Sequence, residues 1–67
     1  MEISARNQLQ GTVKEVRLGT VMAEVVVDVG GQEVVAAITR RSAESLGLKA
    51  GDQVTALIKA TAVLIAK

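Results

Sequence analysis

TVMAEVVVDVGGQEVVAAIT, residues 20–39, decides the fold class. β-Branched residues alternate with other residues along it, a pattern typical of strands that bury one face. Every odd position of residues 20–29 is Val or Ala, so this segment carries one continuous apolar face. Gly30 and Gly31 follow, and glycine accepts the positive φ angles of a tight hairpin turn without steric cost. The stretch therefore predicts a hairpin whose return strand is residues 33–39.

Segments of similar character flank this hairpin. Residues 5–17 form a further expected strand, in which Gly11 permits a bend or bulge. Two more strands are expected at residues 53–59 and 62–66, each rich in Val, Ile and Leu. A turn at residues 18–20 connects the first strand to the hairpin.

The apolar period changes between the third and fourth expected strands. Ala43 and Leu46 are three residues apart, and Gly47 follows as the residue that ends a helix. We expect a short helix here with Thr39 as its N-cap, although Ser42 is an alternative cap. The resulting order predicts an all-β fold, a five-stranded OB-like barrel with one short helix between strands 3 and 4. We expect it to form a single domain over residues 1–67.

Size and composition limit what can stabilise this domain. The chain has 67 residues, no Cys and no His, which excludes disulfides and thiolate or imidazole metal ligands. So small a core usually needs support, and we therefore expect a homo-oligomer. The beginning of the chain lacks a signal-peptide pattern, and no apolar run reaches the ~20 residues of a membrane helix. We expect a cytoplasmic protein.

The residue inventory also limits the chemistry. Without His, general acid–base catalysis would need converging carboxylates, and the seven acidic residues are spread along strands and turns. We therefore predict no catalytic residues and no enzyme activity. A nucleic-acid-binding OB domain is the alternative function, but the chain has no aromatic residue for base stacking and a net charge of only +1.

Three short stretches concentrate hydrogen-bond donors and contain no carboxylate. Ser4 and Arg6 are two apart on an extended segment, so their side chains leave the same face. Lys59 stands at a strand end, and the small Ala60 after it lets the backbone approach a ligand. A frayed polar segment and a surface lysine are the simpler interpretations of these two stretches.

The third stretch is the expected helix start. Thr39 and Ser42 add two hydroxyls to a helix N-terminus, whose free N–H groups and partial positive charge suit an anion. Plain capping by Thr39 is the simpler interpretation. The character shared by the three stretches predicts a small-anion site.

ISARNQLQGTV, residues 3–13, resembles the opening signature of the Mop, or molbindin, family of molybdate-binding proteins. The likeness continues through LGLKAGDQVTALIKAT, residues 46–61, and covers essentially the whole chain. The resemblance implies an OB-like barrel assembled into a hexamer, a trimer of dimers. It further implies that molybdate, and tungstate as its analogue, binds between the subunits.

The family pattern also implies which residues bind the oxyanion. Matched position by position, they are Ser4, Arg6, Thr39, Ser42, Lys59 and Ala60. No side chain is expected to bind molybdenum directly, because the metal is carried as molybdate. The family has a second type of site near symmetry axes, to which the motif assigns no residue. The family domain also occurs fused to other modules, and this chain, which stands alone, is expected to store, buffer or deliver molybdate.

Overall fold

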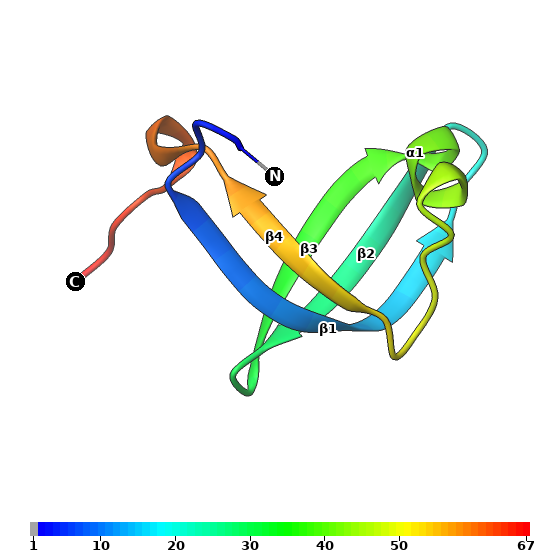
Figure 1. Ribbon diagram of the computed structural model, residues 1–67, viewed down its shortest axis with the longest axis horizontal. Helices are drawn as coiled ribbons and strands as arrows, with labels where there is room; N and C mark the ends of the chain where they lie inside the picture. The colour runs from blue at the N-terminus through cyan, green and yellow to red at the C-terminus, as the bar shows by residue number, and fades with distance from the viewer. Residues whose placement is uncertain (1) are drawn as a thin grey trace.

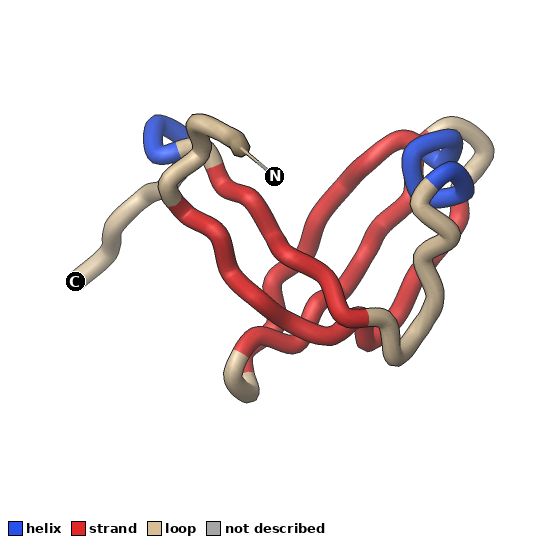
Figure 2. Tube along the Cα trace, viewed as in Figure 1, coloured by secondary structure: helices blue, strands red, loops and turns tan. Residues whose placement is uncertain are grey.

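The structure is a computed structural model that describes residues 2–67; Met1, the first residue of the predicted domain, lies outside the described residues. It contains four strands, one α-helix and one short 3₁₀ helix (Figures 1 and 2). In chain order they are β1 (Asn7–Leu18), β2 (Met22–Val29), β3 (Gln32–Thr39), α1 (Arg40–Ser45), β4 (Gln53–Ile58) and η1 (Ala60–Ala62).

The four strands form one antiparallel sheet in the order β3-β2-β1-β4. β1 joins its two halves, because it pairs with β4 over residues 7–12 and with β2 over residues 12–18. Figure 1 shows β1 curving strongly between these partners. The register shifts between Val13 and Glu15, which leaves Lys14 as the extra residue of a bulge.

Gly11 lies where β1 crosses from one partner to the other. A Cβ atom at this position would lie 2.6 Å from the backbone oxygen of Asp28 and 2.7 Å from a methyl group of Val27. Only glycine lets the two backbones approach so closely. The structural reason for glycine at this position is the close approach of β1 to β2, and the bulge that was predicted as one possibility at Gly11 lies at Lys14 instead.

The core sits on the inner face of the curved sheet. Val13, Val25 and Val27 are buried together, and Ala23 is buried on the same face of β2. The predicted apolar face is therefore confirmed at Ala23, Val25 and Val27, whereas Val26, on the opposite face, is buried as well. Val21 is the exception: it lies in the turn before β2 and is 69% exposed. The predicted glycine hairpin is confirmed, with φ of 58° at Gly30 and 88° at Gly31.

The helix also follows the sequence prediction. Thr39 is its N-cap, and Gly47 follows the helix with a φ of 62°. The N–H of Leu48 donates to the Ala43 carbonyl at 3.1 Å, which closes the helix end. Ala43 is buried, as predicted, whereas Leu46 is 68% exposed on the rim of an apolar groove described below.

The predicted fifth strand and the closed five-stranded barrel are wrong for the single chain. η1 turns the chain away after β4, and residues 63–67 pair with no strand (Figure 1). β3 and β4 are the two edges of the sheet, so the curved OB-like sheet stays open between them. Alternating apolar residues form a strand only where they reach an edge to pair with, and η1 directs residues 63–67 away from both free edges of their own sheet. No helix among residues 2–67 is long and apolar enough to cross a membrane.

Candidate functional site

The end of the β1–β4 ladder brings two of the predicted donor stretches together. Asn7 pairs with Ile58 as the last pair of this ladder. The residues just before Asn7 and just after Ile58 therefore lie at the same end of the sheet. We call Ser4, Arg6, Lys59 and Ala60 the β1–β4 donor group.

The cations of this group differ from most others in the chain. Salt bridges join four other cations to carboxylates: Lys14 to Glu33, Arg17 to Glu15, Arg40 to Glu44 and Lys49 to Asp52. The hydrogen bond from Lys49 lowers the pKa of Asp52, and the hydrogen bond to Glu33 raises the pKa of Lys14. Within residues 2–67, neither Arg6 nor Lys59 has such a carboxylate partner. The β1–β4 donor group therefore contains two positive charges, on Arg6 and Lys59, that no carboxylate of the described residues neutralises.

The third predicted stretch forms a separate group on α1. The Ser42 N–H donates to Thr39 Oγ1 at 3.0 Å, and the Thr39 hydroxyl donates to Ser42 Oγ at 2.8 Å. The capping predicted for Thr39 is thus confirmed. Because a hydroxyl has one proton, this arrangement leaves the proton of the exposed Ser42 free for a ligand. We call Thr39 and Ser42 the α1 donor group.

Arg40 fixes this group to the rest of the fold. Its backbone N–H donates to the Val21 carbonyl at 2.8 Å, and its Nη1 donates to the Gly19 carbonyl at 3.2 Å. Both acceptors belong to the turn between β1 and β2. The start of α1 is thereby held against this turn.

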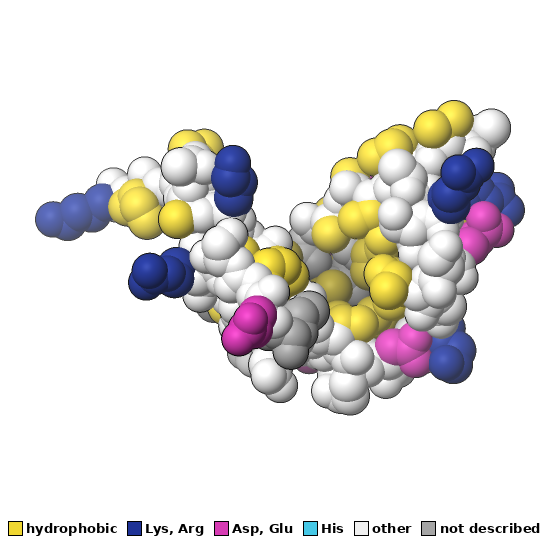
Figure 3. Space-filling model, turned by 45° about the horizontal axis from the view of Figure 1, so that its top comes forward, with side chains coloured by type: hydrophobic (Ala, Val, Ile, Leu, Met, Phe, Trp, Pro, Cys, Tyr) yellow, Lys and Arg dark blue, Asp and Glu magenta, His cyan; other side chains and the backbone are white. Residues whose placement is uncertain are grey.

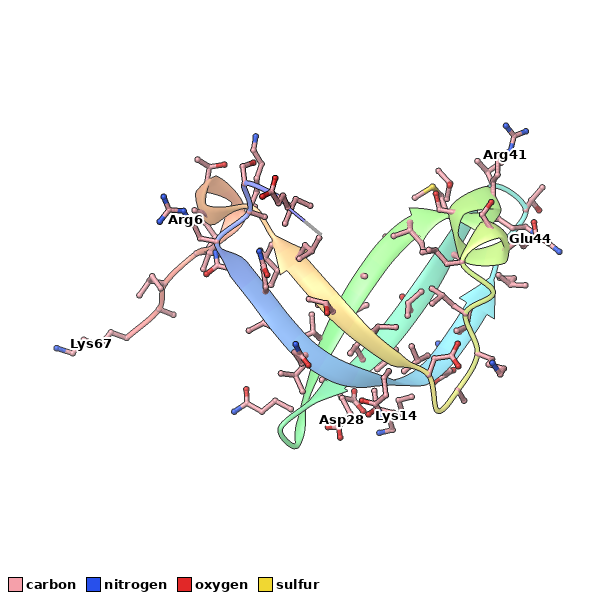
Figure 4. The ribbon with its side chains drawn as sticks, viewed as in Figure 1. Arg6, Lys14, Asp28, Arg41, Glu44 and Lys67 are labelled. Atoms are coloured by element: carbon pink, nitrogen blue, oxygen red, sulfur yellow. The ribbon has the colours of Figure 1, made fainter. Side chains whose placement is uncertain are left out.

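The two donor groups lie toward opposite ends of the molecule. Figure 4 labels Arg6 at one end, and Arg41 and Glu44 of α1 at the other. One chain therefore presents two separate halves: it brings Ser4, Arg6, Lys59 and Ala60 to one end, and Thr39 and Ser42 to the other. A site that uses all six residues requires more than one chain.

A feature that the sequence interpretation missed is an apolar groove of about 570 Å³ between the sheet edges. Figure 3 shows hydrophobic side chains gathered in a hollow of the surface. The groove is lined by residues of β2, β3, β4 and the segment after α1, among them Val34, Ala36, Ile38, Val54, Ala56, Ile58 and Leu48. The sequence signal for this groove was the alternation of apolar residues along β3 and β4, which gives each strand an apolar inner face. β3 and β4 are the edge strands of the sheet, so each has a neighbouring strand on one side only.

Comparison with known proteins decides the family. A family model described as TOBE domain matches residues 3–65. The chain belongs to the TOBE domain family. The TOBE domain is 52% identical to molybdenum-pterin-binding protein 3 of Clostridium pasteurianum, an alignment covering 97% of each chain. It is 47% identical to molybdenum-pterin-binding protein 1 of the same organism, again over 97% of each.

Solved structures agree with this assignment. A molybdate-binding protein from Sporomusa ovata is 55% identical to this TOBE domain and superposes with a TM-score of 0.96 over the full length of both chains. The cytoplasmic molybdate-binding protein ModG, solved with molybdate bound, is 44% identical with a TM-score of 0.85. That match covers 90% of this TOBE domain and 43% of ModG. The resemblance to the molbindin family is confirmed.

Proposed function

We propose that this TOBE domain binds molybdate in a site that two subunits build together. The observation that carries the proposal is that Arg6 and Lys59 flank the last pair of the β1–β4 ladder, and that neither has a carboxylate partner within residues 2–67. Two cations at the same end of the sheet without neutralisation raise the local positive potential, which favours binding of an anion there. Ser4 and the backbone at Ala60 add neutral donors to the same group.

The donor set suits this particular anion. Molybdate has four acceptor oxygens and, near neutral pH, no proton to donate, so its best site contains donors only. Hydrogen bonds from Arg and Lys to an anion are about twice as strong as neutral ones. Phosphate keeps a proton for much of its population near pH 7, and the donor groups contain no carboxylate to accept it. Tungstate has the same shape and charge and should bind as an analogue.

The relatives support the ligand. Two relatives that align over 97% of this chain are named as molybdenum-pterin-binding proteins, and ModG holds molybdate in its structure. These are names of binding proteins, which agrees with our prediction that this chain is not an enzyme. We propose that it stores and buffers molybdate in the cytoplasm, where ModG is described as acting.

The α1 donor group of a second subunit completes the proposed site. It lies too far along the molecule to serve the β1–β4 donor group of its own chain (Figure 4). The free proton of Ser42 would approach the oxyanion from across an interface, and Thr39 would hold Ser42 in place through the hydrogen bond to its Oγ. Such a site couples anion binding to assembly, because each anion then bridges two chains.

Self-association is supported by the groove and by residues 63–65. Leu64 and Ile65 are 92% and 88% exposed, and Val63 already has an extended backbone. The groove between β3 and β4 is apolar and is flanked by two free strand edges. We propose that residues 63–65 of one subunit cover the groove of another subunit, which gives a dimer. We further propose that three such dimers form a hexamer.

Isothermal titration tests the function directly. We expect saturable heat with molybdate and tungstate, and little heat with phosphate at the same concentration. Equal binding of phosphate would contradict the donor-only site. Absence of heat with molybdate would overturn the proposed function.

A further inference from the structure

The side chain of Asn7 joins the two strands that carry the β1–β4 donor group. Its Nδ2 atom donates to the Ile58 carbonyl at 3.1 Å, in a partly buried position. Asn7 follows Arg6 directly, and Ile58 directly precedes Lys59. One hydrogen bond, between residues 51 apart in sequence, therefore spans the ladder end next to the two proposed anion-binding cations.

An amide at this place goes against the pattern of β1. The ladder aligns Asn7 with Ile58 and Leu9 with Ala56, and the residues at these inward positions are otherwise mostly apolar. Asn is also disfavoured in strands. A polar residue that breaks the pattern and is satisfied by one specific carbonyl indicates a positional role.

Among the side-chain hydrogen bonds of residues 2–67, one other involves the segment before β1. Gln8 Nε2 donates to the Ala5 carbonyl at 2.9 Å, which folds the segment back on itself but does not attach it to β4. Within residues 2–67, the side chains of Ser4 and Arg6 make no hydrogen bond to the rest of the chain. The Asn7 amide is thus the side-chain tie between this segment and the strand that ends at Lys59.

We propose that Asn7 is the positioning residue of the oxyanion site, and not one of its ligands. Its Nδ2–H bond to Ile58 fixes the spacing of Arg6 and Lys59 before the anion arrives. A site held in place loses less conformational freedom on binding, so its affinity is higher. This inference rests on the function proposed above.

The test replaces Asn7 with Ala and, separately, with Leu, which nearly preserves its volume. We expect molybdate affinity to fall roughly 10–100-fold, the range seen when residues that orient ligand-binding groups are removed. The Leu variant keeps the inward position filled, so its melting temperature should stay near that of the wild type while its affinity falls. Gln10→Ala is the control, because Gln10 is an exposed amide on the same strand without a side-chain hydrogen bond.

A double-mutant cycle with Arg6→Ala separates positioning from direct contact. If Asn7 acts by placing Arg6, Asn7→Ala costs little further affinity once Arg6 is gone. Additive losses would overturn the inference, as would Asn7 variants that melt at a lower temperature but bind like the wild type. Wild-type protein that binds no molybdate would instead overturn the proposed function, so the two failures are distinguishable.

Amide hydrogen exchange of the anion-free protein gives a readout that does not depend on binding. We expect exchange at residues 4–6 and 59–61 to accelerate in the Asn7 variants and to stay unchanged in Gln10→Ala. Unchanged exchange in the Asn7 variants would contradict the positioning role.

Discussion

At the scale of single residues, the cations of the proposed site share the absence of a counter-charge with Arg41 and Lys67 within residues 2–67, and only Arg6 and Lys59 flank the end of a strand ladder. Lys14 and Arg17 have carboxylate partners nearby, whereas Arg6 and Lys59 have none within residues 2–67. The sequence predicted the donors but could not show which cations are neutralised. The Lys14–Glu33 pair, for example, connects residues 19 apart in sequence through a bulge that no motif reveals.

Removing either unpaired cation should therefore weaken binding without unfolding the sheet. For Arg6→Ala and Lys59→Ala we expect molybdate affinity to fall about 10–100-fold, since a hydrogen bond to a charged group contributes about 1.5–3 kcal/mol. Lys14→Ala removes the same charge from a cation already paired with Glu33, and it should bind almost normally. Titration calorimetry measures the affinities and circular dichroism the fold.

An equal loss of affinity in Lys14→Ala would show that only the overall charge matters. Loss of the folded state in Arg6→Ala would make Arg6 a structural residue.

At the scale of elements, the sequence predicted the interior of the sheet well and its last strand wrongly. The hairpin of β2 and β3 was predictable because both strands and their glycine turn are contiguous. The strand expected at residues 62–66 depended on reaching a partner edge, and η1 leads the chain away from the two free edges, β3 and β4. The sequence also could not show that the donor stretches divide into two groups, because the β1–β4 register and the position of α1 determine that division.

The close approach of β1 to β2 depends on Gly11. In Gly11→Ala the new methyl group would meet the Asp28 backbone oxygen, which cannot move without breaking the β1–β2 ladder. We expect the free energy of unfolding to fall by about 1–3 kcal/mol, as for other overpacked interiors. Urea unfolding measures it, with the exposed neighbour Gln10→Ala as the control.

A Gly11→Ala variant as stable as the wild type would mean that β1 can shift away from β2 at little cost. The close approach of the two strands would then not be required for the fold.

At the scale of the whole molecule, the single chain has two features that it does not satisfy by itself. Its apolar groove is open between the β3 and β4 edges, and its donors are divided between two ends. The proposed association of identical chains would resolve both deficits. It would also support a fold of 67 residues that has no disulfides and no aromatic side chains.

Charges placed in residues 63–65 should therefore break the assembly. For Leu64→Asp and Ile65→Asp we expect a shift to smaller species, because a carboxylate cannot enter the apolar groove without a large desolvation cost. Sedimentation velocity measures the size, and Lys67→Asp serves as a control outside the apolar segment. An unchanged assembly in both variants would show that these residues do not cover the groove.

The central claim is that each molybdate site combines the β1–β4 donor group of one subunit with the α1 donor group of another. Co-expression of an Arg6→Ala chain with a Thr39→Ala/Ser42→Ala chain tests it, with bound molybdate counted by native mass spectrometry. Each variant alone loses one half of every site, whereas random mixing restores about one intact site in four if the halves come from different chains. We predict this recovery of tight binding in the mixed oligomers; mixed oligomers that bind no better than either variant alone would contradict the claim.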